Sequence, residues 1–359
     1  MFSLFGRKKN VIALDLGSSY VKVLEMSLSR GRQVVTAFGF QKLPPEAIVD
    51  GALMNSNDIV STIQELLQRH RIRTRDVVTS VSGHSVIIKK ITMPAMNREE
   101  LAESIQWEAE HYIPYKLDDV NIDAQILTPA KGEASQMEVL LVAAKKELIN
   151  DYTSILREAG LNPCCIDVDA FAVQNMFELN YDVRADESVV LVNIGASIIN
   201  INVLRNGNTA FTRDISLGGN QFTEEIQKHL NVSYEEAEAL KVGGEIMGDS
   251  QSVVPQEVEN IMMGVAETVA AEIKRSLEFY SATSTEEHIS RLYLSGGSAR
   301  VPGLVRMIEQ RTGVPVEIVN PFRRIEVPEK ILKASHLEQI APMAAVSVGL
   351  ALRRAGDNQ

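Results

Sequence analysis

The sequence predicts an α/β protein built from two homologous β-sheet domains and a smaller α/β insertion. A segment of strand, tight turn and strand occurs twice, about half a chain apart. A compact run of strands and helices lies between the two copies, and helical periodicity follows the second. The length of 359 residues suits two domains of ordinary size.

The repeat aligns residues 11–23 with residues 189–201. Three positions correspond in the two copies: Asp15 with Asn193, Gly17 with Gly195, and Lys22 with Asn200. Each copy continues through a second turn, at Arg30-Gly31 and at Asn206-Gly207, into a third strand. Because the turns match as well as the apolar strands, homology is favoured over chance similarity.

Both hairpin turns carry groups that can bind phosphate. The residues are Gly17, Ser18 and Ser19 in the first turn, and Gly195, Ala196 and Ser197 in the second. Glycine lets the backbone approach a phosphate closely, and neighbouring amides and hydroxyls donate hydrogen bonds. Asp15 would face the accompanying Mg²⁺ through water, since this ion loses its hydration shell reluctantly. Lys22 either supplies a compensating charge or is a solvated edge residue.

Three later segments carry glycine-rich turns and a charged pair. The residues concerned are Gly218, Gly219, Glu238, Lys241, Gly296, Gly297 and Ser298. Gly218 and Gly219 open a predicted helix. Glu238 and Lys241 lie on one face of another helix, and the simplest interpretation of these two is an ion pair on the protein surface. The last three residues follow a buried strand, and their glycines would let a flat base pack on the backbone.

Composition and missing motifs exclude several functional classes. With a net charge of -11, no broad basic surface is available for nucleic acid. No apolar run reaches the roughly 18 residues of a membrane-spanning helix. The adjacent Cys164 and Cys165 supply neither a disulfide framework nor spaced zinc ligands, which fits a reducing cytoplasm. Walker A, dinucleotide-binding, nucleophile-elbow and HExxH motifs are all missing from the sequence.

Taken together, these motifs resemble the actin-like ATPase superfamily, which includes actin, MreB and FtsA. The resemblance implies an actin-like ATPase fold of two ribonuclease H-like domains, with ATP and Mg²⁺ as cofactors. In that superfamily the counterparts of Glu238 and Lys241 contact the nucleoside, and the counterpart of Gly296-Gly297 lies against the adenine. Asp169 aligns with the water-positioning acid of MreB-type proteins and is the candidate general base, with helix capping as the alternative.

One position departs from the superfamily pattern. Aspartate is usual where this sequence has Asn193. An amide there can hydrogen-bond but is a poorer partner for magnesium or a proton, so hydrolysis is expected to be weak or absent. Restoring aspartate is expected to raise turnover.

The segment between the halves resembles the inserted subdomain of FtsA and of the PilM family. A strand at 86–93 precedes the capping box Asn97-x-x-Glu100 and a helix, and a strand at 137–143 precedes a second helix. The predicted division is as follows: residues 1–93 form the first core subdomain, completed by 166–186 and 341–359; 94–165 form the FtsA-like insertion; 187–216 form the second core subdomain, completed by 289–340; and 217–288 form a nucleotide-capping subdomain.

Three features resemble the PilM family, cytoplasmic proteins of type IV pilus machines: the Phe2–Lys9 opening, the Gln106–Tyr115 stretch and the Asn193 hairpin. The resemblance implies an ATP-binding adaptor peripheral to the inner membrane, which links the membrane platform to cytoplasmic motor components for pilus assembly and twitching motility. It also implies that the N-terminal cytoplasmic peptide of the membrane protein PilN binds between the first core subdomain and the insertion.

Aromatic residues of the insertion could line such a groove, although a core position is expected for Trp107, Tyr112 and Tyr115. FtsA reaches membranes through a C-terminal amphipathic helix, whereas this chain ends directly after its last expected domain helix. Direct membrane insertion is therefore not expected. The alternative functions are an FtsA-like filament-forming ATPase and, less favoured, a small-molecule kinase of the same fold.

Overall fold

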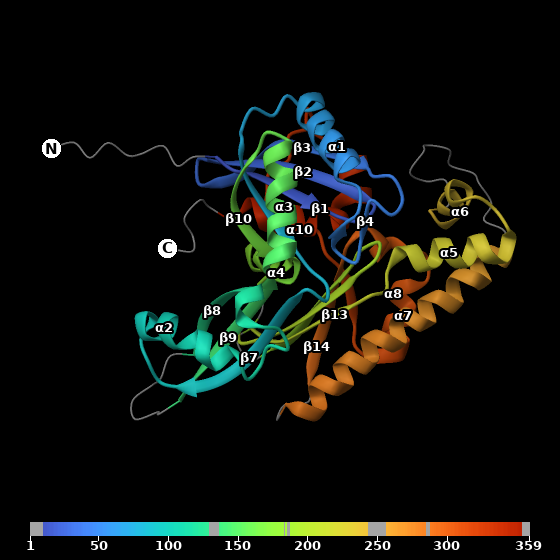
Figure 1. The fold of residues 1–359 in the computed structure, drawn as a ribbon. Helices are drawn as coiled ribbons and strands as arrows, with labels where there is room; N and C mark the ends of the chain where they lie inside the picture. Colours follow the sequence, from blue (N-terminus) through green and yellow to red (C-terminus); the bar gives the residue numbers. More distant parts are fainter. Residues whose placement is uncertain are drawn as a thin grey trace. The chain divides into compact units, whose positions relative to one another are not determined.

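The computed structural model describes residues 10–128, 136–182, 184, 187–242, 256–284 and 288–353 (Figure 1). The Phe2–Lys9 segment, which contributed to the resemblance above, lies outside these residues. The chain divides into two compact units. Unit 1 comprises Met1–Val81, Ile149–Tyr181 and Asn320–Gln359, and unit 2 comprises Ser82–Leu148 and Asp182–Val319.

Unit 1 is built on a five-stranded sheet in the order β10-β6-β1-β2-β3. Its strands are β1 (Ile12–Leu16), β2 (Tyr20–Ser29), β3 (Arg32–Lys42), β6 (Asp76–Val81) and β10 (Asn162–Val168). Neighbouring strands of β1, β2 and β3 are antiparallel, whereas β6 pairs in parallel with both β1 and β10. The other elements are β4 (Ile48–Val49), β5 (Ala52–Leu53), α1 (Ser56–Arg69), α3 (Lys146–Glu158), α4 (Asp169–Asn180), α9 (Ala334–Ile340), η4 (Ala341–Ala344) and α10 (Ala345–Ala351).

Unit 2 contains a second five-stranded sheet with the same connectivity, in the order β13-β12-β11-β14-β15. Its strands are β11 (Ser188–Ile194), β12 (Ile199–Arg205), β13 (Asn208–Ile215), β14 (Ile289–Ser295) and β15 (Val316–Ile318). Its helices are α5 (Gly219–Leu230), α6 (Tyr234–Lys241), α7 (Gln256–Thr283), η3 (Gly297–Arg300) and α8 (Leu304–Thr312). The predicted internal repeat is thus visible as two sheets of equal topology.

The second turns of the repeat explain why the strands pair in register. Arg30 and Gly31 have φ angles of 50° and 79°, and Asn206 and Gly207 have 52° and 75°. Two consecutive positive φ values define a type I′ turn, which matches the right-handed twist of a hairpin. Glycine and asparagine tolerate this conformation, and Arg30 adopts it in the first turn. The two turns fix the pairing of β2 with β3 and of β12 with β13.

The insertion forms a three-stranded antiparallel sheet in the order β7-β9-β8, with α2 packed against it (Figure 1). Its elements are β7 (Val86–Pro94), α2 (Arg98–Ala109), η1 (Leu117–Asp119), β8 (Val120–Thr128) and β9 (Gln136–Lys145). The predicted capping box is present at Asn97 and Glu100. The subdomain boundaries at 94 and 165 stay a prediction. In the structure the inserted sheet begins at Val86, and β10 belongs to the sheet of unit 1.

Only part of the aromatic expectation is met. Tyr112 and Tyr115 are partly buried against the core of the insertion, which is centred on Val139 and Leu141. Trp107 is 76% exposed, so its predicted core position is wrong. It lies on the solvent face of α2, and the buried positions Leu101, Ile105 and Ala109 of that helix follow the period of four.

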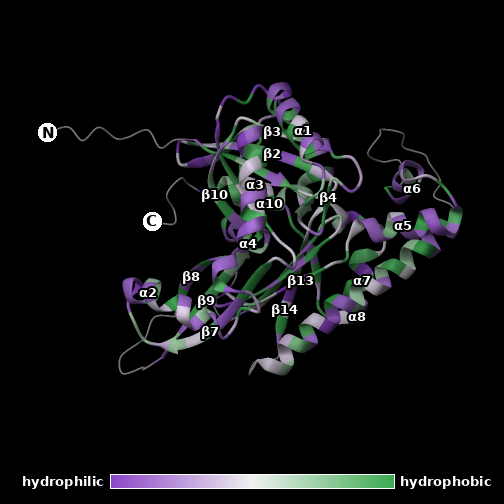
Figure 2. Ribbon diagram, viewed as in Figure 1, coloured by the Kyte–Doolittle hydropathy of each residue, from purple (hydrophilic) through white to green (hydrophobic). Residues whose placement is uncertain are grey.

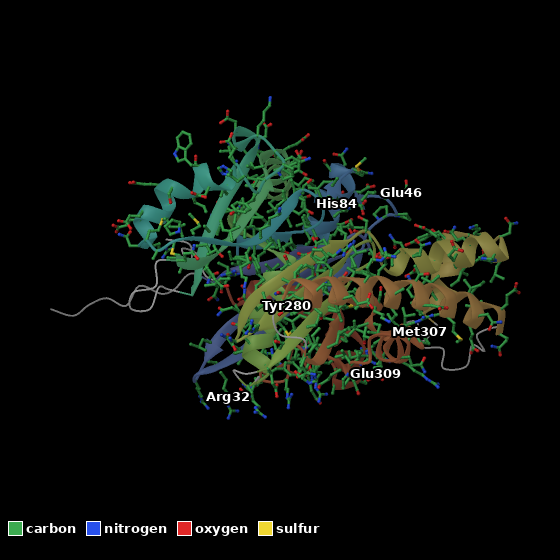
Figure 3. All side chains as sticks on the ribbon, turned by 90° about the horizontal axis from the view of Figure 1, so that it is seen from below. Arg32, Glu46, His84, Tyr280, Met307 and Glu309 are labelled. Carbon is green, nitrogen blue, oxygen red and sulfur yellow. The ribbon has the colours of Figure 1, made fainter. Side chains whose placement is uncertain are left out.

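Apolar side chains at helical spacing bury α7 along the sheet of unit 2. Its buried positions include Val258, Met262, Val265, Val269 and Ile273, and Figure 2 shows the alternation of apolar and polar faces along this helix. Near its end, Tyr280, labelled in Figure 3, packs its ring 5.9 Å from that of Phe211 on β13. This layer supports β11 and β12, whose turn carries predicted site residues.

A close helix contact holds unit 1 together behind β1. α10 packs on α4, and a Cβ added at Gly349 would overlap the backbone carbonyl of Ala172.

We expect Gly349→Ala to lower the free energy of unfolding by about 1–3 kcal/mol, because the two helix backbones must separate. Gly264→Ala is the matched control, since Gly264 is an exposed helical glycine whose Cβ would meet open space. There the free energy of unfolding should rise by up to about 1 kcal/mol. Urea unfolding followed by circular dichroism measures both changes, and equal effects at the two sites would contradict this packing.

Candidate functional site

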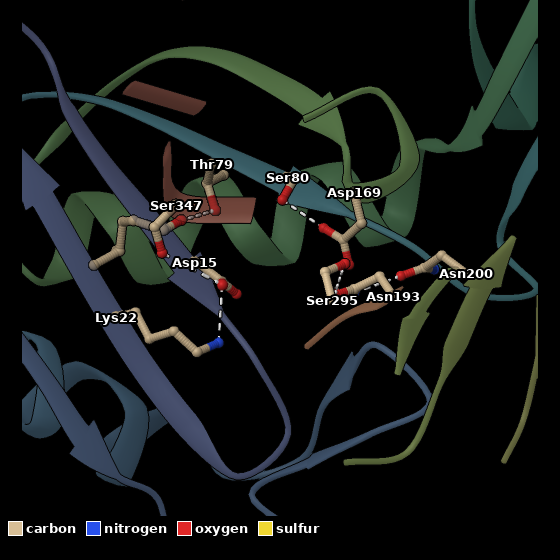
Figure 4. Close-up of polar contacts among 10 residues, drawn as sticks. Asp15, Lys22, Thr79, Ser80, Asp169, Asn193, Asn200, Ser295 and Ser347 are labelled. Atoms are coloured by element: carbon tan, nitrogen blue, oxygen red, sulfur yellow. Dashed lines mark hydrogen bonds and ion pairs between the residues drawn. The ribbon is translucent and has the colours of Figure 1, made fainter. Parts of the chain in front are cut away.

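The first hairpin carries an ion pair across its two strands. Asp15 lies opposite Lys22, and Lys22 Nζ donates to Asp15 Oδ2 at 2.8 Å (Figure 4). Their side chains are 10% and 13% exposed, so Lys22 is not a solvated edge residue. Ser347 Oγ lies 3.5 Å from the same carboxylate oxygen. The turn closes with a hydrogen bond from the Gly17 amide to the Tyr20 carbonyl at 3.1 Å, and Ser18 and Ser19 lie half-buried within it.

Asp169 is the first residue of α4, and Val168 occupies the N-cap position. Ser80 Oγ at the end of β6 donates to Asp169 Oδ1 at 2.5 Å (Figure 4). Tyr152 is buried within the same unit and donates to the carbonyl of Gly51 at 3.1 Å. Burial, together with smaller effects of the Asp169 and Asp15 carboxylates, raises the pKa of Tyr152 above its ordinary value. Its hydroxyl therefore stays protonated at neutral pH.

The second hairpin holds an amide pair at the equivalent register. Asn193 lies opposite Asn200, and Asn193 Nδ2 donates to Asn200 Oδ1 at 3.0 Å (Figure 4). Asn200 Nδ2 donates onward to Asp214 Oδ1 at 2.9 Å. Ser295 Oγ on β14 donates to Asn193 Oδ1 at 3.2 Å. Both polar atoms of the Asn193 side chain therefore have protein partners.

These contacts continue to the start of the insertion. The Gly83 amide donates to Asp214 Oδ2 at 2.7 Å, and Gly83 lies in the loop that leads into β7. In the same loop, His84 Nε2 lies 2.8 Å from Ser216 Oγ, and the Tyr115 hydroxyl donates to the His84 carbonyl at 3.2 Å. We use the term polar network for Ser295, Asn193, Asn200, Asp214 and the Gly83 amide.

The carboxyl group of this network belongs to Asp214, a half-buried residue of β13. Burial raises the pKa of Asp214, and the hydrogen bonds from Asn200 and Gly83 and the charge of His84 oppose that rise. Each carboxylate oxygen accepts one of these hydrogen bonds. Because buried donors are costly to leave unpaired, Asp214 fixes both the side chain of Asn200 and the backbone at Gly83.

The turn after β11 is the centre of a hydrogen-bonded cluster. The Gly195 carbonyl accepts from the Gly219 amide at 2.9 Å and from Ser298 Oγ at 3.0 Å. The Ala196 carbonyl accepts from the Asn220 amide at 2.8 Å. The structure thereby brings together the second hairpin turn, the start of α5 and η3, three segments that are far apart in the sequence.

Glycine is required at two positions around this turn. A Cβ at Gly218 would lie 2.6 Å from the Ala196 carbonyl oxygen. Gly296 has a φ of 94°, and a Cβ there would overlap the backbone of Ile194. Gly297 differs, because it is exposed and a Cβ on it would meet no atom within 4 Å. The turn therefore presents an open backbone surface at Gly297.

Glu238 and Lys241 form a largely buried pair, so the alternative of a surface ion pair is wrong. Lys241 Nζ lies 2.6 Å from Glu238 Oε2, and the two side chains are 10% and 21% exposed. Lys241 also donates to the Gly219 carbonyl at 3.2 Å and to Thr223 Oγ1 at 3.0 Å. Thr223 Oγ1 in turn donates to Glu238 Oε2 at 2.6 Å. The capping segment is thus joined to the start of α5.

The predicted site residues fall into two groups, one in each unit. Unit 1 holds Asp15, Gly17, Ser18, Ser19, Lys22 and Asp169. Unit 2 holds Gly195, Ala196, Ser197, Gly218, Gly219, Glu238, Lys241, Gly296, Gly297 and Ser298. The sequence-based prediction left out Ser80, Tyr152, Asn200, Asp214 and Thr223. Because the repeat aligns Asn200 with Lys22, and Asn193 with Asp15, the sequence contained a signal for the contact between Asn193 and Asn200.

The surroundings of Asp15 can be compared with the needs of a magnesium ion. Asp15 Oδ2 is engaged by Lys22, whereas Oδ1 has no hydrogen-bond partner among the described residues. Magnesium at phosphates commonly uses one or two carboxylates and keeps several waters. One free carboxylate oxygen fits that pattern. Within the described part of the chain, no three His, Cys, Asp or Glu residues cluster as a metal site made by the protein alone.

The sheets and connections define the class of protein, which is the actin-like ATPase fold predicted from the sequence. Two solved structures share it at low sequence identity. The ethanolamine utilization protein EutJ from Carboxydothermus hydrogenoformans has a TM-score of 0.57 at 15% identity, covering 96% of this chain and 89% of that one. An MreB of Spiroplasma citri bound to AMPPNP has a TM-score of 0.52 at 11% identity, covering 96% and 95%.

Within this class the chain belongs to the PilM family of type IV pilus assembly proteins. The family model described as type IV pilus assembly protein PilM matches residues 13–355. A solved PilM-PilN type IV pilus biogenesis complex contains a chain that is 30% identical, with a TM-score of 0.84, covering 96% of this chain and 98% of that one. The cell division protein FtsA of Bacillus subtilis is 22% identical over 86% of this chain and 78% of its own length. The resemblance seen in the sequence is confirmed.

The polar network leads to a prediction about Asn193. In Asn193→Asp, two acceptors would face each other at positions 193 and 200, and rotating the Asn200 amide would only move the conflict to Asp214. We expect this variant to lower the free energy of unfolding by about 1–3 kcal/mol.

Adding Asp214→Asn to that variant should restore most of the loss. The carboxylate would then lie at position 193, Asn200 could reverse its amide, and residue 214 could donate to Asn200 while accepting from the Gly83 amide. Urea unfolding of both single variants and the double variant gives the coupling energy, expected at about 0.5–3 kcal/mol in favour of the pair. Additive effects of the two substitutions would contradict the network.

Proposed function

We propose that this protein is an ATP-binding adaptor of a type IV pilus machine. In this proposal it binds the N-terminal cytoplasmic peptide of a PilN-type membrane protein and is thereby held at the cytoplasmic face of the inner membrane. From there it links the membrane platform to motor components for pilus assembly and twitching motility. Membership of the PilM family and the solved PilM-PilN complex of a relative support the choice of partner. Among the described residues, every helix is too short or too polar to cross a bilayer.

The single observation that carries the adaptor role is the polar network. It joins Asn193, next to the second hairpin turn, to Gly83 at the start of the insertion, entirely within unit 2. A group bound at this turn can therefore affect the loop that leads into β7 through hydrogen bonds. Tyr115 extends the connection to the insertion itself, because its hydroxyl binds the His84 carbonyl.

Nucleotide binding is supported by the geometry of the two hairpin turns and of η3. Each turn ends a buried strand at a glycine, and the turn after β14 presents open backbone at Gly297. We propose that the protein binds ATP. In unit 1 the turn at Gly17 would donate hydrogen bonds to phosphate; in unit 2 the turn at Gly195 would do the same, and the open backbone at Gly297 would accept the adenine. Asp15 would hold the magnesium ion through water, and Lys22 would balance the charge.

The surroundings of Asn193 support binding with weak hydrolysis. Its amide group is engaged by Ser295 and Asn200, so it supplies neither a carboxylate for magnesium nor a base for water. Asp169 remains the candidate for positioning a water molecule in unit 1.

Gly297→Trp should abolish ATP binding, because the indole would occupy the space proposed for the adenine. Gly264→Trp is the matched control, since it introduces the same side chain at an exposed helical glycine with open space around it. Isothermal titration with ATP and Mg²⁺ measures the affinities of the wild type and both variants. An unchanged affinity for ATP in Gly297→Trp would contradict the placement of the adenine at this turn.

ATP turnover by the wild type should lie far below the enzyme median of roughly 10 per second. The double variant Asn193→Asp/Asp214→Asn tests whether the amide limits turnover, because it adds the carboxylate while keeping the network paired. Phosphate release measured under saturating ATP gives both rates. A wild-type rate near the median would favour an enzyme over an adaptor.

Recruitment to membranes should depend on the partner peptide. Liposomes that display a PilN-type cytoplasmic peptide should carry the protein in a flotation assay, whereas bare anionic liposomes should repel a protein of charge -11. A variant in which residues 86–145 are replaced by a short glycine linker should lose the peptide-dependent binding. The excision is feasible because the Lys145 amide lies 3.0 Å from the Ser85 carbonyl, so the two ends meet.

Retained ATP affinity would show that the excised variant is folded. Strong binding of the intact protein to bare liposomes would contradict the proposal. So would undiminished peptide binding in the excised variant.

A further inference from the structure

A hollow of about 600 Å³ lies in unit 1, at the ends of α1 and α3. It is lined by three arginines, Arg71, Arg73 and Arg75, and by the amide side chains of Gln64 and Gln68. Leu67 and Ala159 contribute the apolar part of the wall. We refer to this hollow as the arginine pocket. Its volume falls in the range of small-ligand sites, roughly 300–1,000 Å³.

The three arginines occupy alternate positions of the short segment that joins α1 to β6. Exposed Arg71, Arg73 and Arg75 alternate with buried Ile72 and half-buried Thr74. All three arginines line the same hollow. None of the three arginine side chains has an ion pair or hydrogen bond with another described residue.

A simpler explanation is that these arginines neutralise the ends of the two helices. A helix C-terminus carries roughly half a negative charge, so two of them amount to about one charge against three from the arginines. A surplus of about two positive charges remains in a protein whose net charge is -11. Helix neutralisation therefore accounts for only part of the cluster.

The end of α1 places Arg71 at the rim of the pocket. The Arg71 amide donates to the Gln68 carbonyl at 3.1 Å and the Ile72 amide donates to the Leu67 carbonyl at 3.0 Å, so ending the helix accounts for the left-handed φ of 54° at Arg71. Glycine occupies the equivalent position after α3, at Gly160 with φ 81°. Arginine in place of the usual glycine adds a third guanidinium to the lining of the pocket.

We propose that the arginine pocket binds a multiply charged phosphate group, separately from the nucleotide site. Arginine forks bind phosphate oxygens in pairs, and a small group that carries several charges matches three arginines lining one pocket better than a single carboxylate does. A soluble polyphosphate and an anionic lipid headgroup share this chemistry. The overall negative charge of the protein favours the soluble source, because an anionic membrane surface would repel it.

The test compares two substitutions with the same change in charge. Arg73→Gln removes a guanidinium from the pocket, and Arg69→Gln is the matched control, since Arg69 is an exposed residue near the end of α1 that does not line the pocket. Sodium tripolyphosphate is the probe, at 0.15 M salt. We expect Arg73→Gln to weaken its binding about tenfold and Arg69→Gln to change it less than twofold.

Hydrogen exchange separates this site from the hairpin turns. Tripolyphosphate should slow amide exchange at residues 71–75 and 160–161 in the wild type, and this effect should be lost in Arg73→Gln. Protection confined to residues 17–19 and 195–197, or equal affinities in the two variants, would overturn the proposal. Neither outcome depends on PilN-type peptide binding, so the proposed function and this inference can fail separately.

Two further arms identify the source of the ligand. The wild type, Arg73→Gln and Arg69→Gln should bind equally to vesicles of equal parts phosphatidylglycerol and phosphatidylcholine. If Arg73→Gln weakens binding to these vesicles while tripolyphosphate does not bind, the ligand is a lipid headgroup and the assignment to a soluble polyphosphate is wrong. A hexaglutamate peptide that protects residues 71–75 more strongly than tripolyphosphate would overturn the phosphate assignment in favour of an acidic protein segment.

Discussion

Each half of this protein depends on one polar pair across the hairpin at the end of its first strand. The pair occupies the same register in both copies, Asp15 with Lys22 and Asn193 with Asn200. These groups lie at the ends of strands that are otherwise buried, where a polar group without a partner is costly. The first copy meets that requirement with an ion pair and the second with amide hydrogen bonds. The choice of partner decides what each hairpin can do.

The Asn193–Asn200 pair connects the second hairpin to the insertion. In the first copy Lys22 donates to Asp15, whereas in the second copy the amide group of Asn200 has a donor left over, which binds Asp214. Asp214 then has a second oxygen that accepts from the Gly83 amide. The amide pair thus joins the second hairpin to the start of the insertion through Asn200 and Asp214.

The fold and the local turns could be predicted from the sequence because their signals are local. The repeat, the type I′ turns at Gly31 and Gly207, and the capping box at Asn97 all follow from short segments with a clear physical preference. The contact between Gly83 and Asp214 could not, because it joins residues from different elements through a backbone amide that has no sequence signal. The exposure of Trp107 escaped prediction for a related reason, since an aromatic residue on a helix does not reveal which face is buried.

The measurement that tests this account most directly is the exchange rate of the Gly83 amide with and without ATP, by site-resolved hydrogen exchange. If the polar network joins the second hairpin to the insertion, ATP should slow exchange at Gly83 as well as at residues 195–197. Protection at residues 195–197 with an unchanged rate at Gly83 would contradict it.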